Sequence, residues 1–149
     1  MRDYQVRAFE PHHYVMLAED PKSIFNGLDL DFKRIAANFA NNGSYGRSGF
    51  CNSELLVSAG VMTPWPHYGV AWAILASNAA NHPFFVHRAV AEGLWYFIHR
   101  LKLQRLEANV CDDLPQAKRW ATHLGFYEES IMPKYGPRGE TFRKYVILR

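Results

Sequence analysis

Three short segments of the sequence carry residue types that could perform chemistry on their own. His12 and His13 are adjacent imidazoles of a kind that binds zinc, Cys51 is a thiol nucleophile by type, and residues 43–46 read Gly-Ser-Tyr-Gly. Adjacent helical residues point in different directions and no carboxylate or cysteine lies at i+4, so we expect surface histidines and no metal site. Cys51 lacks a catalytic motif and is predicted to be a buried strand residue, whereas 43–46 lacks a phosphate-loop lysine and is predicted to be a turn. Chemistry therefore has to come from residues that the fold brings together.

The composition indicates a single globular domain over residues 1–149. Hydrophobic residues make up 48%, and 17 Lys and Arg face 14 Asp and Glu for a formal charge of +3, with the signs interleaved. So weak a charge argues against a nucleic-acid partner, and no apolar run approaches the ~18 residues of a membrane span. Cys51 and Cys111 make no disulfide framework, and the charged amino terminus differs from a secretory signal. We therefore expect a soluble cytoplasmic protein.

The first half of the chain reads as a strand, two helices and an antiparallel meander. Alternating residues predict the first strand, Glu10-Pro11 begins a short helix, and the apolar spacing in 31–41 predicts a second helix. Asn52-Ser53 and Pro64-Trp65-Pro66 then mark the turns of a meander. The predicted strands are 4–9, 44–51, 54–62 and 68–76.

The second half contains a long crossover helix. An apolar stripe of about five turns covers 84–101, and period-two alternation returns in 105–111, so these strands are predicted to be parallel. Asp112 and Asp113 are the predicted N-cap of the next helix, Gly125 ends it, and the final strands are 126–132 and 142–148. We therefore predict an α/β (α+β) fold with a mixed sheet of six to seven strands, a parallel pair at its centre, and about four helices.

This order of elements, and one stretch above all, resembles the GNAT (GCN5-related N-acetyltransferase) superfamily. The strand Arg105-Leu-Glu-Ala-Asn-Val-Cys precedes the helix Ala117-Lys-Arg-Trp-Ala-Thr-His-Leu-Gly-Phe-Tyr-Glu-Glu, and Tyr135-Gly-Pro-Arg-Gly leads into the last strand. The helix must stop at Gly125 so that Phe126 enters the sheet core. Trp120 and the Pro64-Trp65-Pro66 segment further resemble small GNAT-like proteins of tailed bacteriophages, some of which are internal virion proteins.

The resemblance implies that acetyl-CoA is the cosubstrate. In the family, the strands matching 68–76 and 105–111 splay apart and expose backbone groups for the pantetheine arm, here at Ala73, Ile74 and Leu75. The pyrophosphate binds amides at the start of the following helix, usually through a glycine-rich loop. Residues 80–86 lack glycine, and Pro83 removes one donor. The remaining implied cofactor positions are Leu114 and Arg119 on the later helix.

Two interpretations of the glycine-free loop stay open. In one, side chains neutralise the phosphates in place of the loop amides, and the residues implied are Asn81, His82, His87 and Arg88. In the other, the loop is only a helix start, with Asn81 as its cap and Phe84 and Phe85 packed.

Acetyl transfer to an amine requires a base for the amine and an acid for the leaving thiolate. The family's acid is commonly a tyrosine four residues after the helix alanine, where this chain has Ala121, and its companion asparagine is Leu114 here. Tyr127 and Tyr135 are the alternative acids. The candidate bases near the expected cleft mouth are Glu54, His67 and His82. Trp65, Tyr68 and Trp72 form either an aromatic wall beside the acceptor site or part of the core.

Two functions follow from these observations. The first is an N-acetyltransferase that uses acyl-CoA and acts on a primary amine of a protein or small molecule. The second is a catalytically degenerate GNAT-fold structural or interaction protein, such as a bacteriophage virion component. Its partners would be further copies of itself in a homo-oligomer or the other proteins of a virion. The glycine-free loop and Ala121 favour the second, and the family analogy favours the first.

Overall fold

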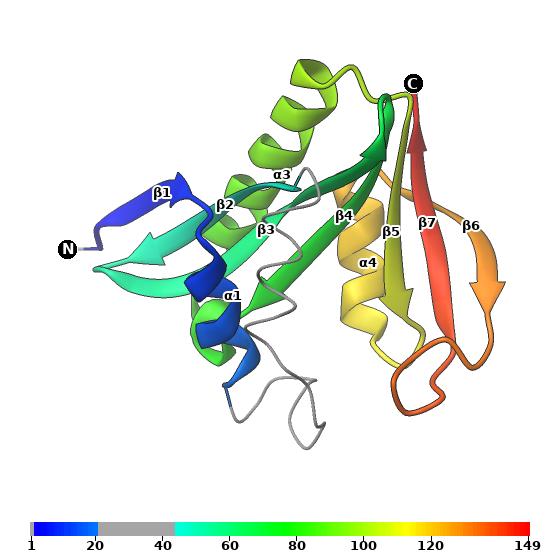
Figure 1. The fold of residues 1–149 in the computed structure, drawn as a ribbon. Helices are drawn as coiled ribbons and strands as arrows, with labels where there is room; N and C mark the ends of the chain where they lie inside the picture. Colours follow the sequence, from blue (N-terminus) through cyan, green and yellow to red (C-terminus); the bar gives the residue numbers. More distant parts are fainter. Residues whose placement is uncertain (1, 21–43) are drawn as a thin grey trace.

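In the computed structural model, which describes residues 2–20 and 44–149, the chain forms one sheet flanked by helices (Figure 1). The predicted helix at 31–41 lies outside the described residues. The strands are β1 (Tyr4–Ala8), β2 (Ser44–Cys51), β3 (Glu54–Trp65), β4 (Tyr68–Leu75), β5 (Arg105–Cys111), β6 (Tyr127–Met132) and β7 (Phe142–Leu148). The helices are α1 (Pro11–Ala18), the short 3₁₀ helix η1 (Ser77–Asn81), α3 (Pro83–Arg100) and α4 (Pro115–Leu124).

The strand order of the sheet is β1-β2-β3-β4-β5-β7-β6, and the β4–β5 pair is parallel. Two-residue turns such as Asn52-Ser53, both with positive φ, connect antiparallel neighbours. The parallel pair instead needs a crossover, which α3 supplies. The predicted fold class is confirmed within the described residues, where a mixed sheet of seven strands carries its parallel pair near the centre.

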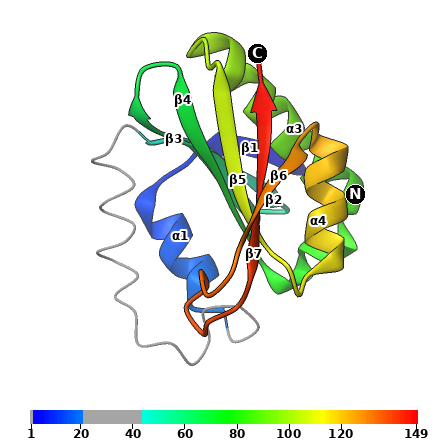
Figure 2. The same cartoon turned by 90° about the vertical axis from the view of Figure 1, so that its right-hand side faces the viewer.

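Helices cover both faces of the sheet, with α3 and α4 on one face and α1 on the other (Figure 2). The larger core lies under α3 and α4 and includes Leu56, Val61 and Leu106, each at most 1% exposed. A smaller core lies under α1, where Leu17 packs with Ile74 of β4. Burial on two faces explains why β3 and β4 are nearly continuous apolar runs. Among the described residues, no helix combines the length and apolar character needed to cross a membrane.

The ends of the helices test the capping predictions. Gly125 has φ of 109° and ends α4, and Phe126 behind it is buried, so both predictions at this end are confirmed. At the other end of α4 the N-cap is Leu114, without a side-chain cap, and not Asp112 or Asp113. The Asp112 carboxylate is instead held by ion pairs, which explains why the cap prediction was wrong.

Two further boundaries differ from the prediction. The N-cap of α3 is His82 and not Asn81, since η1 continues through Asn81. Strand β3 runs past Pro64 to Trp65, whereas a turn was expected there. The ladder with β4 shifts register between Met62 and Trp65, and such an irregularity tolerates a proline that lacks an N–H donor.

Candidate active site

The parallel strands β4 and β5 are paired only at one end. Their register pairs are Tyr68 with Arg105, Gly69 with Leu106, and Val70 with Glu107. Beyond these pairs β4 stays on β3 as far as Leu75 and β5 stays on β7 as far as Cys111, and the two strands diverge (Figure 1). We call residues 71–75 and 108–111 the open end of the pair. Strands that separate in this way leave peptide groups without a sheet partner.

The direction of the β4 peptide groups follows from one hydrogen bond just after the strand. The Ala76 N–H donates to the Leu56 carbonyl of β3 at 2.8 Å. Because N–H and C=O groups alternate between the two sides of a strand, the even-numbered residues of β4 face β3. The odd-numbered residues therefore direct their peptide groups into the open end, and these are Ala71, Ala73 and Leu75. Of the positions predicted for the pantetheine arm, Ala73 and Leu75 thus offer backbone groups, whereas Ile74 is turned toward β3.

The same alternation applies to β5. The Asp112 N–H donates to the Thr141 carbonyl at 2.9 Å, and the Arg149 N–H donates to the Gln104 carbonyl at 2.9 Å. Even-numbered residues of β5 therefore face β7, and the odd-numbered residues Asn109 and Cys111 face the open end. An extended ligand lying there has peptide donors and acceptors on both sides.

The start of α3 lies beyond the carboxyl end of β4. Pro83 is the first helical residue, and the Val86 N–H donates to the His82 carbonyl at 3.0 Å. The Tyr4 hydroxyl of β1 lies 2.9 Å from Nδ1 of His82, and the Tyr4 ring stacks on Phe85 with centroids 4.4 Å apart. Phe84 is 90% exposed, so the interpretation in which Phe84 and Phe85 both pack is wrong for Phe84. The N-terminal strand thus supports the helix start, a long-range contact for which the sequence has no signal.

The predicted basic cofactor residues on α3 have other partners. Nδ1 of His87 accepts the Trp120 indole N–H at 3.0 Å, which ties α3 to α4. The exposed Arg88 pairs with Glu92 one turn later at 3.0 Å. Neither bond directs charge toward the start of α3, so a phosphate site there depends first on helix amides and His82.

The positions implied on α4 divide between surface and core. Leu114 and Arg119 are exposed. Ala121 is 5% exposed and packs in the larger core. The described α4 therefore carries no hydroxyl at the position where the family resemblance implied an acid, and the candidate acids Tyr127 and Tyr135 lie outside α4.

A buried carboxylate marks the point where β4 and β5 separate. Glu107 accepts hydrogen bonds from the Tyr68 hydroxyl at 2.7 Å and from Arg105 Nε at 2.6 Å, and Lys144 Nζ lies 3.4 Å away. Burial raises the pKa of Glu107, but these bonds outweigh it and the net pKa is lowered. Burial and then Glu107 raise the pKa of Tyr68 to about 12, so Tyr68 holds its proton. Arg105 also donates to Glu129 at 2.9 Å, so both carboxylates beside it are ion-paired.

Asn109 and Tyr135 lie on the same face, two residues further into the open end. Asn109 Nδ2 donates to the Tyr135 hydroxyl at 3.2 Å, and the Tyr135 ring packs on Phe142 with centroids 5.2 Å apart. Asn109 Oδ1 is shielded from solvent and has no hydrogen-bond partner among the described residues. The sequence predicts Tyr135 as a candidate acid but gives no signal for Asn109, since a lone strand asparagine carries no motif.

The other predicted catalytic residues lie in three different places. Glu54 and His82 are beyond the carboxyl end of β4, where Glu54 accepts a hydrogen bond from Asn78 at 2.5 Å. Tyr127 is on β6, which β7 separates from β5. His67 lies in the turn before β4 with Nδ1 2.9 Å from the Lys102 carbonyl. That turn is at the paired end, so the expectation that His67 lies near the cleft mouth is wrong.

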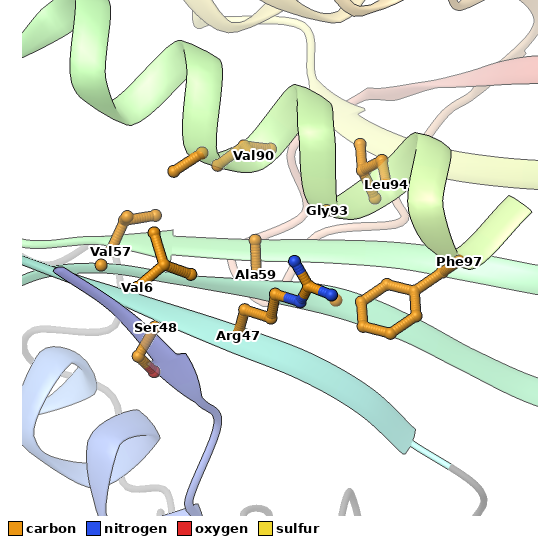
Figure 3. Close-up of a pocket in the computed structure, with 12 residues that line it drawn as sticks. Val6, Arg47, Ser48, Val57, Ala59, Val90, Gly93, Leu94 and Phe97 are labelled. Atoms are coloured by element: carbon orange, nitrogen blue, oxygen red, sulfur yellow. The ribbon is translucent and has the colours of Figure 1, made fainter. Parts of the chain in front are cut away.

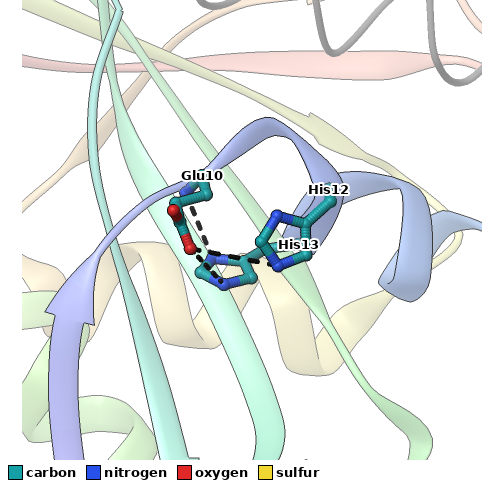
Figure 4. Close-up of side chains that lie close together, drawn as sticks. All are labelled: Glu10, His12 and His13. Atoms are coloured by element: carbon teal, nitrogen blue, oxygen red, sulfur yellow. Dashed lines mark hydrogen bonds and ion pairs between the residues drawn. The ribbon is translucent and has the colours of Figure 1, made fainter.

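The two adjacent histidines converge instead of pointing apart, which corrects the first sequence expectation. Figure 4 shows both imidazoles turned toward the Glu10 carboxylate, with His13 Nε2 at 3.5 Å and His12 Nε2 at 3.9 Å. His13 is also buried, with Nδ1 accepting the Glu10 N–H at 3.1 Å and lying 2.8 Å from Ser48 Oγ. A neutral His13 with an accepting Nδ1 carries its proton on Nε2, the atom a metal would need. The positive end of α1 also disfavours a cation, so we assign this cluster to helix capping.

Two hollows lie between β1, β2 and α3, away from the open end. The more enclosed one, of about 10 Å³, has room for no more than one water and is lined mainly by apolar residues, with Arg47 and Ser48 as its polar side chains (Figure 3). The other, of about 370 Å³, is an open hollow beside β1 and the first residues of β2. Neither is lined by β4 or β5, so neither belongs to the candidate site.

Comparison with known proteins identifies the fold. No protein-family model matches the chain, and no curated protein matches it. A chimeric spermidine N-acetyltransferase SpeG of Vibrio cholerae matches with a TM-score of 0.77 at 15% identity, over 97% of this chain and 95% of that chain. YncA, named as an acetyltransferase of Salmonella typhimurium and solved with its cofactor acetyl-CoA, matches with a TM-score of 0.73 at 13% identity. That match covers 97% of this chain and 93% of that chain.

These likenesses define the class of fold and no more. The chain has the GNAT fold, as its mixed sheet and diverging parallel pair also indicate. At such low identities the activity of the matched proteins does not transfer with the fold.

Proposed function

We propose that the chain is an acyl-CoA-dependent N-acetyltransferase, which transfers the acetyl group of acetyl-CoA to a primary amine. The observation that carries this proposal is the open end of the β4–β5 pair, where both strands keep their outer partners while their facing peptide groups have none in the ladder. A pantetheine arm contains two amides and can pair with such groups as an added strand does. Ala73 and Leu75 of β4 would hold it, with Asn109 opposite.

The phosphates of the cosubstrate would lie at the start of α3. The first-turn amides of Phe84 and Phe85 remain available as donors at the positive end of the helix, although Pro83 supplies none. His82 and Asn81 flank these amides. His87 and Arg88 contribute at longer range, because each already has a side-chain partner.

Among the candidate acids, Tyr135 is the one that contacts the open end, through Asn109. We assign Tyr135 the protonation of the thiolate that leaves when the amine attacks the thioester. Positioning the amine against the thioester supplies much of the remaining rate acceleration.

Thermal unfolding with acetyl-CoA tests the proposal. A ligand at 100 times its dissociation constant stabilises a protein by about 2.7 kcal/mol, so the unfolding temperature should rise with acetyl-CoA concentration. The substitution Ala73→Pro removes one N–H that points into the open end and should weaken binding at least tenfold. Ala73→Val keeps that N–H and serves as the matched control, with an affinity close to wild type.

The alternative function is a GNAT-fold module without chemistry, including a structural component of a virion. Two observations favour it, namely Pro83 in a glycine-free loop and Ala121 in the core in place of a tyrosine. Unchanged unfolding temperature at millimolar acetyl-CoA would support this alternative and refute the enzyme proposal. Equal binding by the Ala73→Pro and Ala73→Val variants would refute only the placement of the arm.

A further inference from the structure

One polar atom beside the open end lacks the partner that its burial demands. Asn109 Oδ1 is shielded from solvent, and no donor among the described residues reaches it, while Nδ2 of the same amide donates to Tyr135. A buried acceptor without a partner costs about 1–3 kcal/mol. Such a group in a native structure calls for an explanation, and a role in binding or catalysis is one of those that recur.

The position of Asn109 indicates which ligand group would do so. Asn109 comes two residues after Glu107, the last residue of β5 that pairs with β4. Its side chain is on the same face as Glu107 and Tyr135, the face that bears α1. An amide oxygen accepts hydrogen bonds, so the missing partner is an N–H or O–H donor placed beside the reacting thioester. The amides of a pantetheine arm also carry N–H groups, but the peptide carbonyls of the open end offer them acceptors. The donor that remains for Asn109 is the attacking amine.

The charges around Asn109 narrow the class of amine. Glu107 lies where the strands part, and Arg105 binds both this carboxylate and that of Glu129. Lys144 adds a second cation to Glu107. Two ion-paired carboxylates neither attract a polycation nor remove a proton from an ammonium group. The site therefore favours an amine that is already uncharged when it arrives.

We propose that Asn109 is the amine-positioning residue of this site and that the preferred acetyl acceptor of the site is a weakly basic primary amine, such as the α-amino group of a peptide. This inference rests on the proposed acetyltransferase function. Free α-amino groups have a pKa of about 7.7, against about 10.4 for a lysine ε-amino group. At pH 7.5 the uncharged fraction of the α-amine is about 300-fold larger.

The reaction that follows is balanced in atoms and charge. The amine nitrogen bonds to the thioester carbonyl carbon while Asn109 Oδ1 accepts a hydrogen bond from one N–H of the amine. The C–S bond then breaks with its electron pair on sulfur, which takes the Tyr135 hydroxyl proton. The nitrogen loses one proton to water, and the Tyr135 oxygen regains a proton from water. The products are the N-acetyl amine and free CoA thiol.

The test measures release of the CoA thiol by the full-length protein at pH 7.5 with acetyl-CoA and three amines. The probes are alanyl-glycinamide, Nα-acetyl-lysine amide and spermidine. Wild type should use the α-amine at least 100-fold better by kcat/KM than either alkylamine. Asn109→Leu should lower kcat/KM for the α-amine at least tenfold. Its acetyl-CoA affinity should stay within about twofold of wild type, because the substitution keeps the peptide groups of residue 109 that face the arm. Its urea midpoint should fall only slightly, since the replaced oxygen has no partner to lose and the lost Nδ2 bond to Tyr135 is long and exposed.

Asn109→Asp supplies the matched comparison. A carboxylate at this position favours the ammonium form and can accept its proton, so the preference for the α-amine should narrow at least tenfold. Equal use of the three amines by wild type, no transfer to any of them, or a large loss of stability in Asn109→Leu would overturn the inference. In each case retained binding of acetyl-CoA would leave the proposed cosubstrate site in place. Loss of acetyl-CoA binding would refute both that site and the role of Asn109.

Discussion

A glycine in the middle of α3 provides a sharp test of the packing described above. Gly93 is buried against the enclosed hollow of about 10 Å³, and a Cβ built there would meet only Arg47 Cδ, at 3.9 Å (Figure 3). Replacing a helical glycine with alanine gains about 1 kcal/mol of propensity, and burying a methyl group adds about 0.8 kcal/mol. Gly93→Ala should therefore stabilise the protein by about 1–2 kcal/mol. In a chain of this length that corresponds to an unfolding temperature roughly 3–6 °C higher.

Gly60→Ala is the same chemical change at a site with no room. Its Cβ would lie 1.9 Å from the Tyr45 carbonyl oxygen and 2.7 Å from Gly46 Cα, both backbone atoms of β2. The strands would have to separate, so we expect a loss of about 3 kcal/mol or more. Urea unfolding of both variants measures the two effects. A destabilised Gly93→Ala, or a Gly60→Ala variant as stable as wild type, would refute the packing of β2, β3 and α3.

Two further predictions concern buried polar groups. Burial lowers the pKa of His13 below its unfolded value of 6.5, with His12 and Arg7 adding to the effect and Glu10 opposing it. The contribution of neutral His13 to the free energy of unfolding is therefore fully present above pH 6.5 and is lost as the pH falls through the folded pKa. Unfolding temperatures between pH 7.5 and 5 should fall more steeply for wild type than for His13→Gln, and parallel curves would contradict this. Tyr68→Phe removes the 2.7 Å hydrogen bond to Glu107 and should cost about 1.5–3 kcal/mol in urea unfolding, whereas an unchanged midpoint would show that the bond is not made in solution.

The sequence allowed the fold to be predicted because its signals are local. Period-two alternation gave β5, the apolar stripe gave α3, and Gly125 gave the end of α4, each within about one residue. Cap assignment failed where a local preference lost to a distant partner. Asp112 has a suitable side chain for an N-cap, but Arg143, 31 residues later, holds its carboxylate.

The candidate site was less predictable for the same reason. The parting of β4 and β5 followed from the family resemblance, since no residue type encodes an unpaired peptide group. Tyr135 and Asn109 meet only because β5 and β7 pair, and the side-chain oxygen left without a donor is a property of that arrangement. Likewise, His82 gains its Tyr4 partner from a strand 78 residues earlier in the chain.

The three-residue ladder between β4 and β5 makes the sheet two half-sheets joined by a short seam. Few backbone bonds cross this seam, so thermal fluctuations that pivot one half against the other meet little resistance there. A molecule bound in the gap would form hydrogen bonds with both strands and so add to the bonds that join the two half-sheets. Amide hydrogen exchange would record this as slower deuterium uptake at Ala73, Leu75 and Asn109, with uptake in the outer strands unchanged. The divergence that would admit acetyl-CoA therefore also makes the rigidity between the two half-sheets depend on whether acetyl-CoA is bound.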